Sequence, residues 1–156
     1  IKETLDTTNL GILQAGAQVN VERSFKVGDE VGGHIVSGHV TATATLSNLR
    51  AEGHDRVLTF KLTDTWLRFV LHKGYIGVDG ASITVSSVDR EAGTFSISLI
   101  PETIERTTLG KLAIGDKVNV EVDSQTQTIV ETIERMMQDP EMRKVMLQQA
   151  TSGTSN

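Results

Sequence analysis

The side chains of this sequence that could do chemistry lie in four short polar motifs. GGHIVSGHV at 32–40 carries two glycine–histidine pairs, and HKGYIGVDGASITV places Ser82 and Thr84 on one face of an expected strand. In IPETIERTT at 100–108 a proline interrupts a strand and leaves backbone amides for a ligand, and Asp123 ends VNVEVD. An imidazole that titrates near neutral pH, hydroxyls and a carboxylate can hold and transfer protons. As a set, the motifs favour a small-molecule site.

Each motif also has a purely structural explanation. A lone histidine on a strand is more often structural than catalytic, and hydroxyls on an exposed strand face are usually just solvated. Lys73, His54 and His72 are each explained equally well as surface groups. The binding interpretation therefore depends on the whole set, and by itself it reaches no further than a barrel that binds a small molecule.

Several other chemistries are excluded by missing motifs. No glycine-rich loop ends in the Lys-Ser/Thr of a phosphate-binding loop, and no Gly-x-Ser-x-Gly elbow is present. His34 and His39 are five residues apart, which on a strand would point them to opposite faces, and no carboxylate pattern accompanies them. The sequence has no cysteine. We therefore expect no metal site.

The elements that must hold these motifs are mostly short strands. Alternation of apolar and polar residues, broken by Gly, Asp and Asn, predicts strands at 31–40, 41–46, 56–62, 81–88, 94–100 and 117–122. Leu58, Phe60 and Leu62 should share an inner face, as should Phe95, Ile97 and Leu99. Helical spacing in 63–74, with Thr63 or Asp64 as N-cap, and a second short helix at 104–109 complete the domain. The pattern indicates an all-β protein, a six-stranded antiparallel Greek-key barrel with short helices.

An internal repeat relates two distant parts of the chain. Residues 2–24 align without a gap on 101–123 with eleven identities, including Val-Asn-Val-Glu in both copies. Gly16 and Gly115 are expected in turns before a strand, and Gly11 and Gly110 at backbone angles that only glycine adopts easily. The alternative is a common β-turn-β element that recurs by accident. Duplication with a period of 99 residues predicts a parent that begins upstream of Ile1.

Bulk composition limits the possible partners. A net charge of −5 and no cluster of Lys or Arg disfavour nucleic acid and anionic membrane surfaces. No apolar run is long enough to span a bilayer. An acidic sequence without cysteine fits the cytoplasm, which is the expected location.

The last segment differs from the barrel. Residues 126–137 have helical spacing with Ile129, Ile133 and Met136 or Met137 on one stripe, Pro140 interrupts it, and 141–149 resumes the pattern. The helix either packs on its own barrel or joins copies of the chain, and the second alternative rests on the Met-rich stripe and its position outside the barrel unit. Residues 150–156 are expected to be disordered.

The motifs together resemble the riboflavin synthase family. VNVERS, GGHIVSGHV, KGYIGVDGASITV, LIPETIERTTLG and KVNVEVD are similar to its carboxy-terminal barrel, and KETLDTTNLG is similar to the end of its amino-terminal barrel. The resemblance covers about residues 1–137, and the internal repeat matches the tandem duplication of the family. The resemblance implies domains at 1–24 (remnant of the first barrel), 25–123 (second barrel) and 124–149 (oligomerisation helix).

The resemblance also implies a transferase reaction. Two molecules of 6,7-dimethyl-8-ribityllumazine exchange a four-carbon unit and give riboflavin and 5-amino-6-(D-ribitylamino)uracil, without a metal or organic cofactor. The C7 methyl group of the lumazine is acidic because its anion is delocalised into the ring. The protein therefore has to hold two flat rings face to face and move protons.

The site residues follow from matching the motifs. His39, Ser82, Thr84 and Asp123 are the implied catalytic groups, with His39 and a hydroxyl handling the methyl proton and Asp123 orienting Ser82. The implied substrate-binding residues are Lys2, Glu3, Thr4, Gly38, His39, Val40, Lys73, Ser82, Ile83, Thr84, Ile100, Pro101, Glu102, Thr103, Ile104 and Glu105.

In the family, the active site forms between the first barrel of one subunit and the second barrel of its neighbour in a homotrimer. This favours the oligomerisation role for the C-terminal helix. The opening Met-Phe-x-Gly-Ile-Val of the family has no counterpart here, so this chain alone is expected to bind the lumazine weakly and to turn over little. One rival interpretation is a non-catalytic lumazine- or flavin-binding protein of the same fold. Another is a structural oligomerisation module that binds no ligand.

Overall fold

The computed structural model describes residues 1–21 and 26–145 of the chain. The chain divides into two compact units, Ile1–Asp123 and Ser124–Asn156, and each is described by itself. The first unit contains the barrel and the N-terminal helices, and the second begins with the long helix α4.

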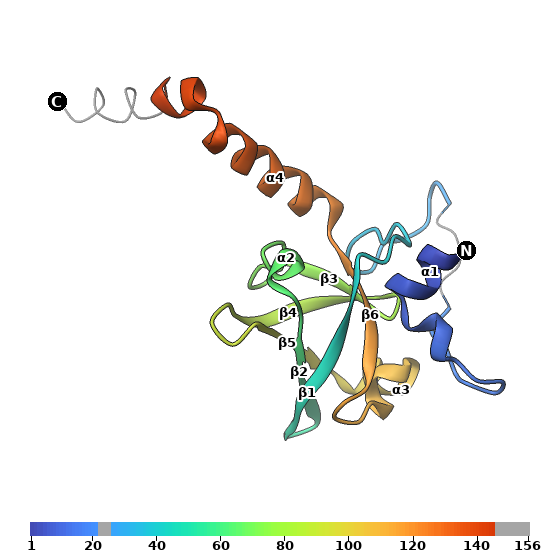
Figure 1. Cartoon of the computed structure of the whole chain (residues 1–156). Coiled ribbons are helices and arrows are strands. Elements are labelled where there is room, and N and C mark those ends of the chain that lie inside the picture. The colour runs from blue at the N-terminus through green and yellow to red at the C-terminus, as the bar shows by residue number, and fades with distance from the viewer. Residues whose placement is uncertain (22–25, 146–156) are drawn as a thin grey trace. The chain divides into compact units, whose positions relative to one another are not determined.

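Six strands close into a single barrel in the first unit (Figure 1). They are β1 Ala42–Glu52, β2 Asp55–Lys61, β3 Tyr75–Val78, β4 Ala81–Asp89, β5 Thr94–Leu99 and β6 Lys117–Val122. The strand order is β1-β2-β5-β4-β3-β6, and every neighbouring pair is antiparallel. The predicted six-stranded antiparallel barrel is confirmed.

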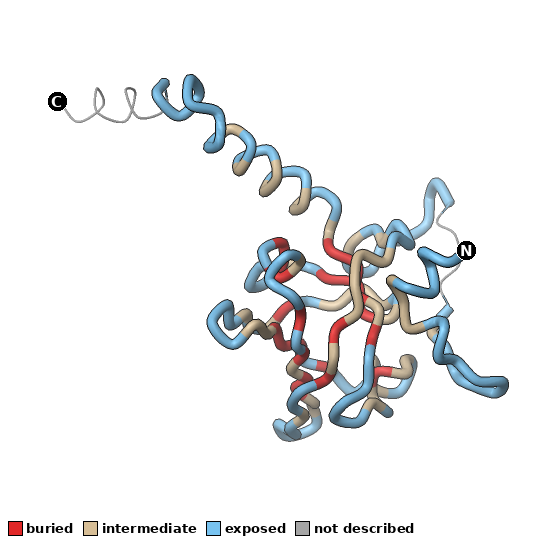
Figure 2. The backbone as a smooth tube through the Cα atoms, in the orientation of Figure 1, coloured by how far each residue is buried: buried red, intermediate tan, exposed pale blue. Residues whose placement is uncertain are grey.

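Most of the buried core residues lie on the strands of the barrel, which carry the red stretches of the tube in Figure 2. The predicted inner faces of β2 and β5 are confirmed, since Leu58, Phe60, Phe95, Ile97 and Leu99 are all buried. Phe60 and Phe95 are register partners whose ring centroids lie 5.4 Å apart. Removing such rings from water is the main stabilising contribution of a small barrel.

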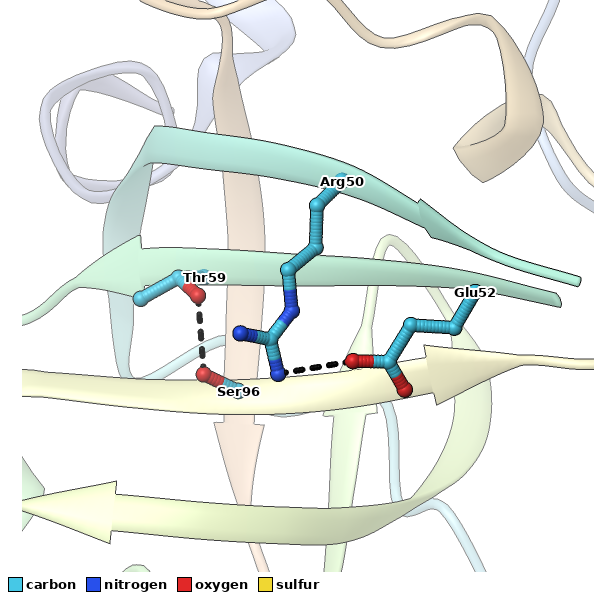
Figure 3. Close-up of polar contacts among 4 residues, drawn as sticks. All are labelled: Arg50, Glu52, Thr59 and Ser96. Atoms are coloured by element: carbon cyan, nitrogen blue, oxygen red, sulfur yellow. Dashed lines mark hydrogen bonds and ion pairs between the residues drawn. The ribbon is translucent and has the colours of Figure 1, made fainter.

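The outer face of β1, β2 and β5 carries polar contacts (Figure 3). Thr59 and Ser96 are register partners, and their hydroxyl oxygens lie 2.8 Å apart. Near the tip of the β1–β2 hairpin, Arg50 Nη2 lies 2.9 Å from Glu52 Oε1, and both side chains are more than half exposed. Exposed pairs of this kind add little stability, so Glu52 is a suitable control position.

One predicted strand is wrong and another was missed. Residues 31–40 form a loop, because Gly33 and Gly38 adopt positive φ angles of 95° and 85° that a strand does not contain. The sixth strand is instead β3, only four residues long. Its glycine, Gly77, weakened the apolar alternation that reveals longer strands. The predicted strand at 41–46 is also longer than expected and extends to Glu52 with an irregularity after Leu46.

The short helices occur close to the predicted positions. The segment 63–74 contains one helical turn, α2 Asp64–Leu67, with Thr63 as N-cap but without a side-chain capping bond. The helix expected at 104–109 is two elements, α3 Pro101–Arg106 and the 3₁₀ turn η2 Thr108–Lys111. The N-terminal segment forms α1 Lys2–Thr7 and the 3₁₀ turn η1 Asn9–Ile12.

The two repeated segments have the same local structure. Thr8 and Thr107 separate a six-residue helix from a 3₁₀ turn in each copy. Each of these threonine hydroxyls donates to the carbonyl four residues earlier and accepts the N–H two residues later. The copies then diverge, because 118–122 belongs to β6 whereas 19–21 joins no sheet within the described chain.

The glycines of the repeat are used in two ways. Gly16 and Gly115 have φ angles of 89° and 98°, as expected for turns. The expectation for Gly11 and Gly110 is wrong, since neither has a positive φ. A Cβ at Gly110 would instead lie 2.7 Å from the carbonyl oxygen of Ile104, so this position needs glycine because α3 packs against it.

The second unit contains the predicted C-terminal helix. Helix α4 spans Ser124–Gln138, and Ile129, Ile133 and Met137 on it are 59%, 55% and 47% exposed. Helical structure resumes at Pro140 and continues through 145, where Asp139 Oδ1 accepts the N–H groups of Glu141 and Met142. The rest of the predicted 141–149 segment and the predicted disordered tail lie outside the described residues. No helix in residues 1–21 and 26–145 has the length and apolar character needed to cross a bilayer.

Candidate functional site

The candidate site lies on the outer face of β4, β3 and β6. Strand register places Ser82 beside Gly77 and Gly77 beside Glu121 in one row across the three strands. Thr84 and Tyr75 form the next pair on the same face, because side chains two residues apart on a strand point the same way. A Cβ at Gly77 would lie 3.0 Å from the Cβ of Glu121, so the glycine leaves room in the middle of the row.

One end of the loop 31–40 is attached to this row at Ser82. The backbone N–H of His34 donates to Ser82 Oγ at 3.0 Å, and His34 Nδ1 lies 2.6 Å from the same oxygen. The imidazole stacks on Tyr75 with the ring centroids 5.4 Å apart. Within residues 1–21 and 26–145, His34 Nε2 is buried without a hydrogen-bond partner. A buried polar nitrogen in this state is suited to a ligand or a water molecule.

Gly33 is the residue that lets the loop come so close. Its φ is 95°, and a Cβ there would lie 2.9 Å from the Cβ of Ser82 and still closer to its hydroxyl. Both the backbone conformation and the available space therefore require glycine.

The other end of the loop is attached at Glu121, whose side chain is largely buried. Glu121 Oε1 accepts the N–H of Ser37 at 2.6 Å and its hydroxyl at 2.8 Å, and Oε2 accepts the N–H of Gly38 at 3.0 Å. Ser37 Oγ also lies 3.0 Å from His39 Nδ1. The loop is therefore held at both ends by side chains of the sheet.

The two histidines of the loop contact different hydroxyls. Ser82 Oγ is bonded to His34, whereas the ring of His39 is bonded to Ser37. Sequence reasoning set His34 aside and did not consider Ser37, Tyr75 or Glu121. Glu121 had a visible signal, since it is the charged residue of the repeated Val-Asn-Val-Glu and alternates with buried valines. His34 and Tyr75 are 41 positions apart in the sequence, so only the fold brings them together.

The predicted wall at 100–105 forms the start of α3. Because β5 runs antiparallel to β4, its end at Leu99 lies at the same edge of the sheet as the start of β4. Ile100 is the N-cap of α3 and is half exposed, and Pro101 occupies the first turn. A pocket of about 580 Å³ separates the end of α3 from the N-terminal segment, and Glu105, Gly80, Ala81 and Val19 contribute to its lining.

The remaining predicted residues have different surroundings. Lys73 is exposed in a turn with a φ of 64°. Ile83 points to the opposite face of β4 from Ser82. Gly38 and Val40 line a second pocket, of about 250 Å³, and Asp123 directly follows β6. Lys2, Glu3 and Thr4 are exposed on α1, which precedes the 3₁₀ turn that packs on β6.

The N-terminal segment is attached to the barrel by an exchange of asparagines. Asn20 Oδ1 accepts the N–H of Thr108, and Asn119 Oδ1 accepts the N–H of Asn9, which are equivalent contacts between the two repeat copies. Asp79 lies between them, where its Oδ1 accepts from the N–H of Asn119 at 2.7 Å and from Asn9 Nδ2 at 3.2 Å. Burial raises the pKa of the Asp79 carboxyl, although these two hydrogen bonds act in the opposite direction.

Replacing Asp79 with asparagine tests this balance. A carboxyl whose pKa is raised in the folded state binds its proton more tightly there, so its contribution to stability is lost as pH rises from the unfolded to the folded pKa. Asp79→Asn keeps an Oδ1 acceptor and removes the buried charge. We expect a higher Tm than wild type at pH 7 and a difference that closes below about pH 4. Thermal unfolding by circular dichroism across this range measures it, and a lower Tm at pH 7 would show that the charged hydrogen bonds outweigh burial.

No group of three or more His, Asp or Glu side chains in residues 1–21 and 26–145 is placed to hold a metal ion.

Known proteins are similar to this chain in sequence and in fold. The family described as Lumazine binding domain matches residues 37–123. The riboflavin synthase of Escherichia coli (strain K12) is 49% identical over 138 residues, which cover 88% of this chain and 64% of that protein. The riboflavin synthase of Mycobacterium tuberculosis (strain CDC 1551 / Oshkosh) is 43% identical over 136 residues, or 86% of this chain and 66% of that protein.

Two solved structures have a similar fold. The crystal structure of LumP complexed with 6,7-dimethyl-8-(1'-D-ribityl) lumazine matches with a TM-score of 0.67 at 25% identity, over 78% of this chain and 64% of that one. LumP complexed with riboflavin matches with a TM-score of 0.70 at 24% identity, over 78% and 65%. This chain spans 64% of the length of the E. coli relative. With its closed barrel and the matched residues 37–123, the chain belongs to the lumazine-binding domain family.

Proposed function

We propose that the barrel binds 6,7-dimethyl-8-ribityllumazine on the outer face of β4, β3 and β6, as part of a riboflavin synthase. The observation that carries this proposal is the loop 31–40, which Ser82 and Glu121 hold against a row of polar side chains. A loop that is held at both ends on a sheet can place a flat heterocycle with less loss of conformational entropy on binding than a free loop. The identity to riboflavin synthases extends over both the loop and the sheet.

The reaction needs proton transfer more than any other kind of catalysis. Dismutation of two lumazines to riboflavin and 5-amino-6-(D-ribitylamino)uracil begins when a C7 methyl C–H bond breaks. The electron pair is then delocalised into the ring, and the proton passes to a base. His39 is the proposed base, because imidazole is effective near neutral pH.

The hydroxyls have a supporting role. Ser82 and Thr84 are poor bases, so we assign them to hydrogen bonding with the ring. His34, bonded to Ser82 Oγ and stacked on Tyr75, orients that hydroxyl. Asp123 stays the proposed catalytic carboxylate that orients Ser82. Lys73 and residues 100–105 stay proposed substrate contacts, the latter through backbone groups at the start of α3.

A complete active site requires a second barrel. Two lumazines react face to face, and the described chain contains one closed barrel. We therefore propose that the site is completed by the first barrel of a neighbouring subunit in a homotrimer joined through α4, and that Lys2, Glu3 and Thr4 belong to a first-barrel site. By this proposal the 156-residue chain binds one lumazine and turns over little. We place this activity in the cytoplasm, on the basis of the acidic, cysteine-free sequence.

A non-catalytic lumazine- or flavin-binding protein is the second candidate. The fold match to LumP complexed with a lumazine and with riboflavin favours it. It differs from the first proposal in one respect, because a protein that only binds does not need a base beside the ring.

One measurement tests what the two candidates share, and a second separates them. When riboflavin is titrated with the chain, its fluorescence should be quenched to saturation, as both candidate functions require. Exchange of the C7 methyl protons for deuterium, followed by NMR of the lumazine in D2O, should be faster with the chain than without it, because one bound ring suffices for this step.

His39→Ala is the critical variant. We expect its exchange rate to fall by about 100-fold, the scale of a lost general base, while riboflavin affinity changes much less. His54→Ala, on the β1–β2 hairpin, is the matched control. Exchange that stays within twofold of wild type in His39→Ala would remove His39 from the mechanism, and no acceleration by wild type would favour the binding protein.

A further inference from the structure

The contacts of Ser37 determine which ring nitrogen of His39 carries a proton. A serine hydroxyl has one hydrogen to donate and two lone pairs to accept with. Ser37 Oγ lies 2.8 Å from Glu121 Oε1 and 3.0 Å from His39 Nδ1. It also accepts the backbone N–H of His39 at 3.4 Å. The group to which Ser37 donates its single hydrogen therefore determines which ring nitrogen of His39 is protonated.

The hydrogen of the Ser37 hydroxyl is donated to Glu121. Three donors converge on its side chain, two of them backbone N–H groups, and both carboxylate oxygens accept. A carboxylate offers only acceptors, so the Ser37 hydroxyl must donate to it. Ser37 Oγ then has only lone pairs left for the imidazole, and His39 Nδ1 must be the donor in their contact.

We infer that Glu121 and Ser37 are positioning residues that hold His39 in its Nδ1–H tautomer and so present the Nε2 lone pair as the base. In the neutral imidazole one nitrogen donates and the other accepts, so a donor at Nδ1 leaves Nε2 as the acceptor. The C7 proton passes to Nε2, His39 becomes the imidazolium, and the electron pair stays in the lumazine ring. This inference relies on the proposed function for its substrate, but the tautomer itself does not.

The arrangement also fixes where the histidine lies. Gly38, between Ser37 and His39, donates its N–H to Glu121 Oε2 and has a φ of 85°. Glu121 pairs with Gly77 in the barrel wall. His39 is therefore connected to the sheet through the two residues before it, Ser37 and Gly38, which both donate hydrogen bonds to Glu121. Removal of the partners that orient a metal-binding histidine typically costs about 10–100-fold in affinity or activity, and we expect an effect at the lower end of that range here.

The first test measures the tautomer directly. In the ligand-free chain labelled with ¹⁵N-histidine, the His39 resonances should show a protonated Nδ1 and an unprotonated Nε2 above the pH at which the ring titrates. Ser37→Ala should shift His39 towards the Nε2–H form that predominates in free histidine. Ser98→Ala, an exposed serine on β5, should leave the resonances unchanged. A protonated Nε2 in wild type, or an unchanged tautomer in Ser37→Ala, would overturn the inference.

The second test connects the tautomer to chemistry. Ser37→Ala should slow exchange of the C7 methyl protons by about tenfold, with a change in the dissociation constant for the lumazine of less than about twofold. Glu121→Gln should also slow exchange, because its amide cannot accept from all three donors, and it should weaken lumazine binding as well, because Glu121 holds the loop 31–40 on the sheet. Glu52→Gln is the control carboxylate. Exchange at the wild-type rate in Ser37→Ala contradicts the positioning role. Correct tautomers without acceleration by wild type would contradict the proposed function instead.

Discussion

Gly33→Ala is expected to weaken riboflavin binding by at least about tenfold while the barrel stays folded. An alanine at a φ of 95° is strained by about 1 kcal/mol or more, and its Cβ would overlap Ser82. The loop 31–40 can relieve both problems only by moving away from β4. That movement breaks the His34–Ser82 contacts and shifts the surface on which the ring is proposed to lie. Fluorescence titration gives the dissociation constant, and thermal unfolding reports the barrel.

The neighbouring glycine provides the control for this prediction. A Cβ at Gly32 would meet no atom within 4 Å, and this residue has no positive φ. Gly32→Ala should therefore bind riboflavin within about twofold of wild type. The melting temperature of both variants should stay within a few degrees of wild type, because neither side chain enters the core. Equal affinity in Gly33→Ala and wild type would show that the loop is not part of the binding surface.

Ile129→Glu combined with Ile133→Glu is expected to convert an oligomer of the chain into monomers. The two isoleucines are one helical turn apart on α4 and are 59% and 55% exposed. If copies of the chain join through this stripe, each copy would bury two carboxylates against apolar neighbours, which costs far more than the contact contributes. Sedimentation velocity over a range of concentrations measures the change in mass.

The opposite face of α4 supplies a charge-matched control. Thr128→Glu combined with Gln138→Glu adds the same two charges at exposed positions turned well away from the stripe. We expect this variant to sediment like wild type. A wild-type chain that is monomeric at all concentrations, or a stripe variant that keeps its mass, would rule out α4 as the oligomerisation helix. Riboflavin binding should be unchanged in both variants, since the proposed binding surface belongs to the barrel.

Much of the fold could be predicted from the sequence because it rests on local patterns. Alternation along β2 and β5 identified the buried residues, including Phe60 and Phe95, since burial on one face of a strand repeats every two residues. The repeat predicted that two distant segments are related, and they make the same threonine contacts, although the helix α1 in the first copy was not predicted. The strand β3 was missed because four residues interrupted by glycine are too short for a periodic signal.

The sequence by itself determined the family, the barrel and the presence of histidines and hydroxyls in suggestive motifs. Only the tertiary structure decided which of them meet. His34 reaches Ser82 across 48 positions, and Ser37 reaches Glu121 across 84, because two positive φ angles fold the loop 31–40 back onto the sheet. Strand register then aligned Ser82, Gly77 and Glu121 in one row. Register is a property of paired strands, so no single segment of the sequence carries it.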